Sequence, residues 1–201
     1  MNPIEKYLKS IDTYSTVLFS SISLKLAIFK GFDEKLKINS KEFINISPIL
    51  PFVLESLQVD CVISIYKLIE KGRSENTIHK FLKFISDNQT QISINYPSLT
   101  SELIKKHYEL MNNIENDITK IGYQRNKYFA HSDNIYFHLQ GKLFIEFPET
   151  YKSLSNILNV IIKIISDHHQ IINKSIQINM AEFAYLQVDR LYNSLQKSNE
   201  I

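Results

Sequence analysis

Residues 100–131, TSELIKKHYELMNNIENDITKIGYQRNKYFAH, decide the fold of this chain, because they predict one long amphipathic helix. Apolar side chains form a stripe along this helix, at Leu103, Leu110, Ile114, Ile118 and Ile121. The last steps of the stripe have the spacing of a helix face that is buried in a core. The helix is expected to begin near Ser98 or Thr100. Thr100 can cap it, and the negative charge of Glu102 interacts favourably with the positive end of the helix dipole.

Three further helices are expected ahead of this segment, over residues 4–29, 52–71 and 74–86. Gly31 and Gly72 are expected to end the first two, and Ser74 is expected to cap the third. Asn39-Ser40 predicts a cap for a short turn between the first and the second helix. Residues 89–98 are expected to form a polar loop.

After His131 the helical period is lost, and residues 132–134 are expected to break the helix. Residues 136–140 and 143–147 flank Gly141-Lys142 and predict a small hairpin. A last long helix is expected from Pro148, with a buried stripe at Leu154, Leu158, Ile161, Ile165, His168 and Ile172. A segment over 179–197 either continues this helix or follows a break near Ser175.

These elements predict a single all-α domain over residues 1–201, an antiparallel helical bundle with a small non-helical or hairpin insert after the Arg125–His131 segment. The chain has 201 residues, of which 44% are hydrophobic, which is enough for a sizeable core.

Composition excludes several classes of function. The net charge of +2 is too small for a protein that binds nucleic acid through its bulk charge. A single cysteine, Cys61, excludes an internal disulfide and a cysteine-based metal site, and its apolar neighbours predict a buried thiol. Four glycines leave no phosphate-binding glycine loop and no Gly-x-Ser-x-Gly elbow. No metal or other cofactor is expected.

The sequence predicts a cytoplasmic protein with no membrane contact. Charged residues close to the first methionine argue against a secretory signal. The most apolar stretch, residues 157–172, includes Lys163 and Asp167 and is too short and too charged to cross a bilayer.

Arginine is scarce in this chain, at Arg73, Arg125 and Arg190 only. Arg125 follows Ile121 by four residues, so it falls where the stripe requires an apolar side chain. An unpaired arginine is almost never buried in a core. Three interpretations stay open: Arg125 pairs with an acid inside the bundle, it extends outward at the helix end, or its face lines a cleft or a subunit interface.

His131 lies six residues after Arg125, which on an ideal helix places the two side chains roughly 120° apart. If the helix ends at residues 132–134, His131 lies in the last turn and can turn toward Arg125. The helix dipole favours a cation at that end. Asp133 can accept a hydrogen bond from the imidazole and fix its tautomer.

Such side chains suit RNA cleavage without a metal ion. A histidine can take the proton from the attacking 2′-hydroxyl or protonate the leaving 5′-oxygen. Arg125 can stabilise the charge that develops on the phosphate oxygens. Asn126 can add a hydrogen bond to phosphate or orient His131. The candidate catalytic residues are therefore Arg125, Asn126 and His131, with Asp133 in support.

The segment Arg125-Asn126-x4-His131 resembles the signature of the HEPN superfamily, and its continuation to Asp133 resembles the AbiU-type abortive-infection branch. Residues 59–70 followed by 74–82 are similar to a helix pair of that branch. Within them, residues 67–70 read Lys-Leu-Ile-Glu where the branch often has Arg-Leu-x-Asp. The resemblance covers roughly residues 50–170.

The resemblance implies an all-α bundle that forms a homodimer, with the two arginine–histidine segments at the interface. It implies a metal-independent endoribonuclease that acts on RNA in phage defence or as a toxin, with an antitoxin or another defence-system protein as a partner. Other members bind RNA, nucleotides or proteins without catalysis, so a binding module of the same fold is the alternative. One toxin branch is controlled by modification of a tyrosine two residues after the histidine, where this chain has Asp133.

His168 and His169 are expected to be packed or at an interface, because neighbouring residues on a helix point apart and do not share a metal. The other histidines receive no role: His107 is expected on a solvated face, His79 on the surface and His138 in the hairpin.

Overall fold

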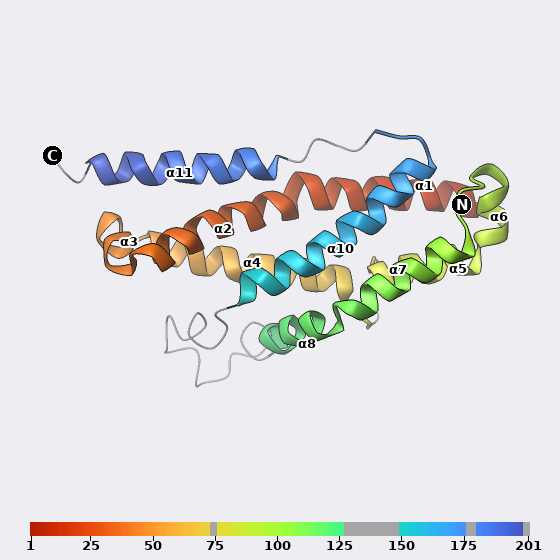
Figure 1. The fold of residues 1–201 in the computed structure, drawn as a ribbon, viewed down its shortest axis with the longest axis horizontal. Helices are drawn as coiled ribbons and strands as arrows, with labels where there is room; N and C mark the ends of the chain where they lie inside the picture. Colours follow the sequence, from red (N-terminus) through yellow and green to blue (C-terminus); the bar gives the residue numbers. More distant parts are fainter. Residues whose placement is uncertain (73–75, 127–148, 176–179, 199–201) are drawn as a thin grey trace.

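The computed structural model describes residues 1–72, 76–126, 149–175 and 180–198, and every regular element in these ranges is a helix (Figure 1). In chain order they are α1 (Pro3–Val17), the π-helical turn η1 (Leu18–Ile22), α2 (Ser23–Ile38), α3 (Ser40–Ile46), α4 (Leu50–Ile69), α5 (Ile78–Asp87), α6 (Gln89–Asn95), α7 (Ser101–Asn113), α8 (Glu115–Gln124), α10 (Thr150–Ile171) and α11 (Ala181–Ser198). The all-α bundle predicted from the sequence is confirmed.

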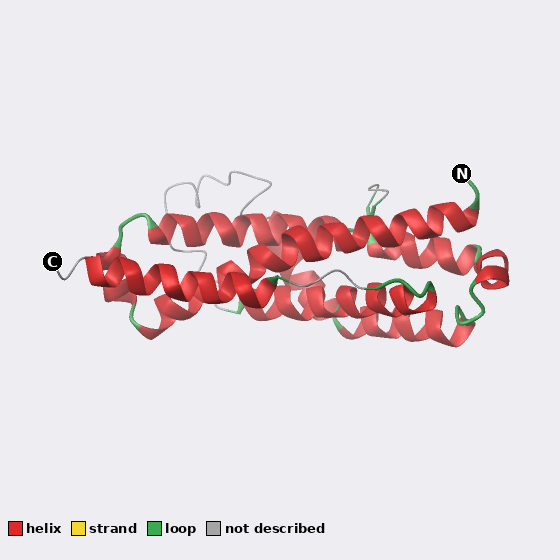
Figure 2. Cartoon of the chain, turned by 90° about the horizontal axis from the view of Figure 1, so that it is seen from above, coloured by secondary structure: helices red, strands yellow, loops and turns green. Residues whose placement is uncertain are grey.

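The helices form an elongated bundle in which most run along one long axis (Figure 2). Helix α11 packs along α2, α4 lies against α2 and α8, and α10 contacts α1, α2, α4, α7 and α8. Helix α10 is therefore the central element of the bundle. Its stripe of Leu154, Ile157, Ile161, Ile164 and Ile165 is fully buried, and burial of each such side chain contributes about 1.5–3 kcal/mol.

The buried apolar residues form one cluster that extends from α1 to α11. Cys61 is fully buried within it, and burial raises the pKa of its thiol to about 12. The predicted burial of this thiol is thereby confirmed. The helical run Pro3–Ile38 is long and apolar enough to cross a membrane, but half of its apolar window is buried inside the bundle, as in the core helix of a folded domain.

The predicted end of the first helix at Gly31 is wrong, because the helix continues to Ile38. Gly31 is buried, and a β-carbon there would lie only 2.9 Å from Val188 Cγ1. The glycine serves the close approach of α11 to α2 and does not stop the helix.

Caps explain the short helices that follow. The Asn39 side chain accepts a hydrogen bond from Glu42 N at 3.2 Å, which confirms it as the cap of α3. Thr77 caps α5 by accepting from Lys80 N at 3.3 Å, whereas the predicted cap, Ser74, lies outside the described residues. The predicted polar loop over 89–98 is wrong, because fully buried Ile92 anchors helix α6 there.

The long helix predicted from Thr100 begins as expected, since the Thr100 hydroxyl accepts from Leu103 N at 3.2 Å. It is not continuous: the backbone departs from helical geometry at Ile114, with φ −105° and ψ 10°, and this residue separates α7 from α8. In α7 the buried residues are Ile104, His107 and Met111. The predicted stripe is thus one residue out of register before Ile114 and correct after it.

Helix α10 ends at Ile171, and Asn173 has a positive φ of 52°, a left-handed conformation that asparagine tolerates at a helix end. Of the two alternatives for the C-terminal segment, the break is therefore the one observed. The predicted hairpin over 136–147 lies outside the described residues.

Candidate functional site at the end of helix α8

Arg125 lies where α8 ends and the chain continues in a wider helical turn through Asn126. The interpretation that Arg125 occupies the buried stripe is wrong. The stripe passes from Ile118 and Ile121 to Gln124, which is 1% exposed, while Arg125 is half-buried at its edge. This geometry keeps the guanidinium at the solvent boundary and is closest to the outward-extending interpretation.

The Arg125 side chain is held by an aromatic ring of α4. Its guanidinium carbon lies 5.4 Å from the centroid of the Tyr66 ring, a cation–π contact. The ring can approach α8 because residue 122 is glycine: a β-carbon there would lie 3.1 Å from Tyr66 Cε2. Gly122 and Tyr66 therefore position Arg125, and neither was identified from the sequence.

Asn126 is exposed beside Arg125 and accepts a hydrogen bond from Arg125 Nη1 at 2.9 Å. Within the described ranges, no ion pair joins Arg125 to a carboxylate. Among the described residues, the guanidinium has one hydrogen-bond acceptor, Asn126 Oδ1, out of the five N–H donors that an arginine carries.

A neutral polar cluster lies next to Arg125 in the chain, at Gln124 of α8, and includes Gln58 of α4 and Thr150 at the start of α10. Gln58 Nε2 donates to Thr150 Oγ1 at 3.2 Å, and Gln124 Nε2 donates to the same oxygen at 3.1 Å. All three residues are at most 5% exposed. Buried amides and hydroxyls need such partners, so this cluster fixes the spacing of α4, α8 and α10 at the residue that precedes Arg125.

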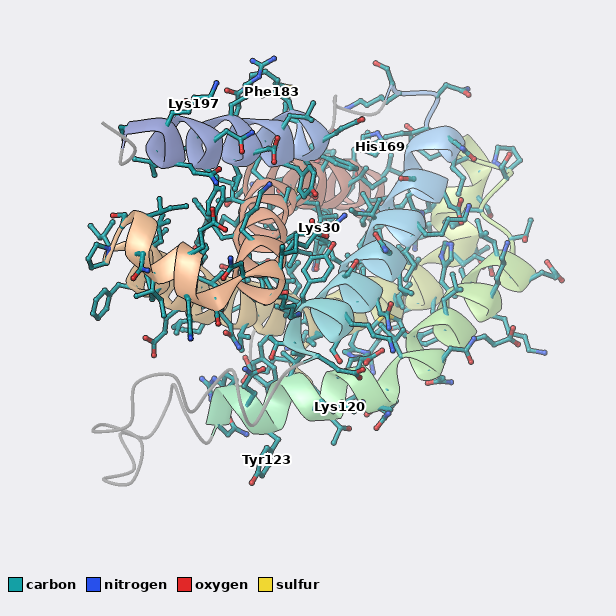
Figure 3. The ribbon with its side chains drawn as sticks, turned by 60° about the vertical axis from the view of Figure 1, so that its left-hand side comes forward. Lys30, Lys120, Tyr123, His169, Phe183 and Lys197 are labelled. Atoms are coloured by element: carbon teal, nitrogen blue, oxygen red, sulfur yellow. The ribbon has the colours of Figure 1, made fainter. Side chains whose placement is uncertain are left out.

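Surface contacts continue this attachment along α8. Asp117 accepts from Ser153 Oγ at 2.7 Å and from Asn156 Nδ2 at 3.0 Å, which ties α8 to α10. Lys71 Nζ lies 2.8 Å from Glu115 Oε1, which ties the start of α8 to the end of α4. On the opposite side of α8, Lys120 and Tyr123 project away from the bundle (Figure 3), and Tyr123 is 54% exposed.

His131 and Asp133, the other predicted site residues, lie outside the described residues, as does His138. The structure therefore brings Arg125 and Asn126 together with Tyr66 but does not report on the histidine. The sequence offered one signal for Tyr66: it belongs to the 59–70 stretch that had been singled out by resemblance. Gly122, Gln58 and Thr150 carried no signal in the sequence alone.

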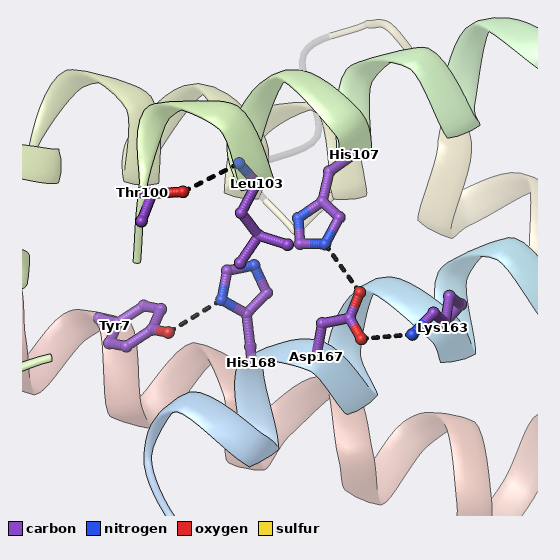
Figure 4. A network of polar contacts seen from close by, with 7 residues as sticks. All are labelled: Tyr7, Thr100, Leu103, His107, Lys163, Asp167 and His168. Atoms are coloured by element: carbon purple, nitrogen blue, oxygen red, sulfur yellow. Dashed lines mark hydrogen bonds and ion pairs between the residues drawn. The ribbon is translucent and has the colours of Figure 1, made fainter. Parts of the chain in front are cut away.

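A second set of polar side chains lies where α1, α7 and α10 meet (Figure 4), and its members are buried except for Lys163, which is exposed. His107 Nε2 and Asp167 Oδ2 are 3.2 Å apart, and Lys163 Nζ donates to Asp167 Oδ1 at 2.5 Å. Tyr7 Oη and His168 Nδ1 are 2.8 Å apart. The expectation that His107 lies on a solvated face is wrong, because His107 is fully buried; the expectation that His168 and His169 are packed is confirmed.

The histidines of this interior set are held neutral. Burial lowers the pKa of His168 to about 3, and the neighbouring His107 adds to the effect. Burial also lowers the pKa of His107, although its bond to Asp167 opposes the shift. Burial alone would raise the pKa of Asp167, but hydrogen bonds from Lys163 and His107 outweigh it and leave that pKa lowered. With no exposed surface on His107 or His168, these groups cannot reach a substrate.

Outside this set, His79 is half-buried and not a surface residue as expected, and burial with the nearby Lys71 lowers its pKa. In the described ranges, no group of three or more His, Cys, Asp or Glu side chains is arranged to hold a metal ion.

The two stretches that carried the resemblance, on α4 and at the end of α8, are thus in contact through Tyr66 and Arg125. A family model, HEPN_AbiU2, described as AbiU2, matches residues 45–193. The chain belongs to the AbiU2 family of HEPN proteins. No curated protein and no solved structure matches the chain. Membership of the AbiU2 family supports a role of the abortive-infection or ribonuclease type.

Proposed function

We propose that this AbiU2 protein is a metal-independent endoribonuclease that acts in the cytoplasm, in phage defence or as a toxin. The observation that carries the proposal is Arg125, a guanidinium held over Tyr66 at the solvent boundary of α8 and followed at once by exposed Asn126. This is the described half of the arginine–histidine motif that the family signature defines.

In the proposed reaction, the 2′-hydroxyl of RNA attacks the adjacent phosphorus and the bond to the 5′-oxygen breaks. The products are a 2′,3′-cyclic phosphate and a 5′-hydroxyl. His131 acts as the general acid or base for these two proton transfers. Arg125 stabilises the negative charge on the phosphate oxygens. Asn126 contributes a hydrogen bond, and Asp133 orients His131.

The test is incubation of the purified protein with cellular RNA in EDTA. Cleavage is expected for the natural chain and is expected to fall by at least about a hundredfold in His131→Ala, the scale of a lost general acid–base group. Arg125→Ala is expected to lose a similar factor. Arg190→Ala is the matched control, because Arg190 is exposed on α11. Undiminished cleavage by His131→Ala would overturn the assignment.

The same variants separate catalysis from the alternative function, a non-catalytic module that binds RNA, a nucleotide or a protein such as an antitoxin. RNA binding that survives His131→Ala and fails in Arg125→Ala, with no cleavage by any form, would select the binding module.

The proposed catalytic unit is a homodimer in which two arginine–histidine segments share one cleft. Specific activity is then expected to fall on dilution as the dimer dissociates, in parallel with the mass measured by light scattering. A fully active monomer would remove the composite site and leave the ribonuclease assignment in place.

A further inference from the structure

A groove between α1 and α5 is lined by an unusual set of side chains. It has a volume of about 840 Å³ and is lined along α1 by Lys6, Lys9, Ser10 and Thr13, and along α5 by Lys80, Lys83, Phe84 and Asp87. On each helix these residues follow the i, i+3, i+4, i+7 spacing of a single face. The two faces therefore oppose each other across the groove, each with two lysines.

The charge of the groove is strongly one-sided. Among its described lining residues, four are lysines and one, Asp87, is a carboxylate. Within the described ranges, no ion pair joins Lys6, Lys9 or Lys83 to an acid. Several lysines elsewhere in the bundle do form ion pairs, among them Lys25 with Asp60, Lys37 with Asp33, Lys71 with Glu115, Lys163 with Asp167 and Lys174 with Asp12.

The groove also offers an aromatic surface. Lys6 Nζ lies over the half-buried Phe84 ring, 4.8 Å from its centroid, so a cation of α1 and a ring of α5 meet in the groove. Grooves that bind single-stranded nucleic acid combine lysines along the backbone path with rings on which bases stack. A small net charge of +2 is compatible with such a site, because the cations are concentrated and not spread over the surface.

We propose that this groove, defined by Lys6, Lys9, Lys80, Lys83 and Phe84, binds the phosphodiester backbone of single-stranded RNA at a distance from the Arg125 site. Figure 1 shows α1 and α5 at one end of the bundle, away from the end of α8. RNA is the occupant argued because the groove deepens the proposed ribonuclease function: it would hold the flanking part of a strand whose scissile phosphate lies at Arg125.

The test measures binding of a labelled, 2′-O-methylated single-stranded RNA, which cannot be cleaved, to the full chain by fluorescence anisotropy. The triple variant Lys6→Gln/Lys9→Gln/Lys83→Gln removes three groove charges. The matched control Lys41→Gln/Lys106→Gln/Lys197→Gln removes the same charge from exposed lysines outside the groove. Circular dichroism checks that both triples remain folded.

The groove triple is expected to weaken binding roughly tenfold or more and to reduce the slope of log K against log salt by about 2, since each phosphate contact contributes about 0.7 to that slope. The control triple is expected to change binding by less than about twofold. Equal losses in both triples, or no loss in the groove triple, would overturn the proposal. The proposal would also be overturned if the groove triple lost binding to anionic lipid vesicles or polyglutamate but kept RNA binding. The groove would then bind another polyanion.

Because the probe cannot be cleaved, this outcome is independent of catalysis. A chain that binds RNA through the groove but never cleaves it would retain the groove and remove the ribonuclease proposal. In a chain that does cleave, the groove triple is expected to impair cleavage of long RNA and to leave cleavage of a dinucleotide unchanged, because a dinucleotide does not reach the groove.

Discussion

Helix α10 has a buried polar cluster at each end, and the two clusters differ in kind. At its start, Thr150 holds two glutamine side chains in a neutral network, and Arg125, which follows Gln124 in the chain, lies at the solvent boundary. Near its other end, Asp167 and His168 belong to an interior set of titratable groups. We call the end with Asp167 and His168 the closed end, because its histidines are buried. We call the end with Thr150 the open end, because Arg125 beside it lies at the solvent boundary.

The difference teaches that buried histidines are poor guides to function in this bundle. An interior histidine that is held neutral acts as a hydrogen-bonding core residue. A guanidinium that needs no internal counterion in the described chain can meet a phosphate. We therefore expect substitutions at the closed end to change stability alone, and substitutions at the open end to change activity more than stability.

The largest expected effect on stability comes from Asp167→Ala at the closed end. This change leaves fully buried His107 without its hydrogen-bond acceptor and removes the partner of exposed Lys163, and an unsatisfied buried donor costs up to about 3 kcal/mol in free energy of unfolding. Urea denaturation measures the loss. Asp12→Ala is the matched control, because the Asp12–Lys174 pair is exposed and surface pairs contribute little. A folded Asp167→Ala variant with unchanged stability would break the comparison.

The second prediction concerns acid. The pKa of His168 is lowered to about 3 in the folded chain and returns to about 6.5 on unfolding. As the pH falls, His168 is therefore protonated in the unfolded chain before it is protonated in the folded chain. Its contribution to the free energy of unfolding is fully present above the unfolded pKa and is lost as the pH drops below that value. From about pH 7.5 to about pH 5, this group alone lowers the free energy of unfolding by roughly 2 kcal/mol.

Urea midpoints measured across this pH range provide the check. In His168→Gln, which keeps a hydrogen-bond acceptor for Tyr7, the acid sensitivity is expected to become shallower by that amount. Equal slopes for the variant and the natural chain would show that His168 is not the group that titrates.

The contrast between the two ends also shows what the sequence could predict. The stripe through Ile118 and Ile121 identified the buried face of α8, because helical periodicity is local. It did not show that Gln124, and not Arg125, continues that face. Both lie at helical spacing from Ile121, and the choice depends on partners from α4 and α10.

The same limit explains the histidines. His107 reads as a solvated residue because Lys105 and Lys106 precede it, and only the packing of α10 against α7 reveals its bond to Asp167. Tyr66 was within reach of the sequence through the family resemblance. Its contact with Arg125 depends on Gly122, which has no side chain and so lets the Tyr66 ring of α4 approach α8. The sequence alone does not reveal this contact.

The third prediction tests the open end through Thr150→Val, which keeps the shape of the side chain and removes the hydroxyl. Gln58 and Gln124 then lose their shared partner in the core, at a cost of about 1.5 kcal/mol in stability. Since Gln124 directly precedes Arg125 and is held by this cluster, RNA cleavage is expected to fall as well. Thr119→Val is the matched control, because the Thr119 hydroxyl is exposed and donates to Glu115 O. A loss of stability with full activity would show that the cluster supports the core and not the site.

The smallest effect on stability is expected from Tyr66→Leu, since a cation–π contact near solvent contributes about 0.5–1 kcal/mol. Its effect on the activation free energy of cleavage is expected to be larger than its effect on stability, because the guanidinium loses the ring that fixes its direction toward a phosphate. Tyr66→Phe retains the ring and is expected to retain activity. If the phenylalanine variant were as impaired as the leucine variant, the hydroxyl would carry the role and the positioning of Arg125 by the ring would be refuted. If neither variant changed cleavage, the open end would be as inert as the closed one.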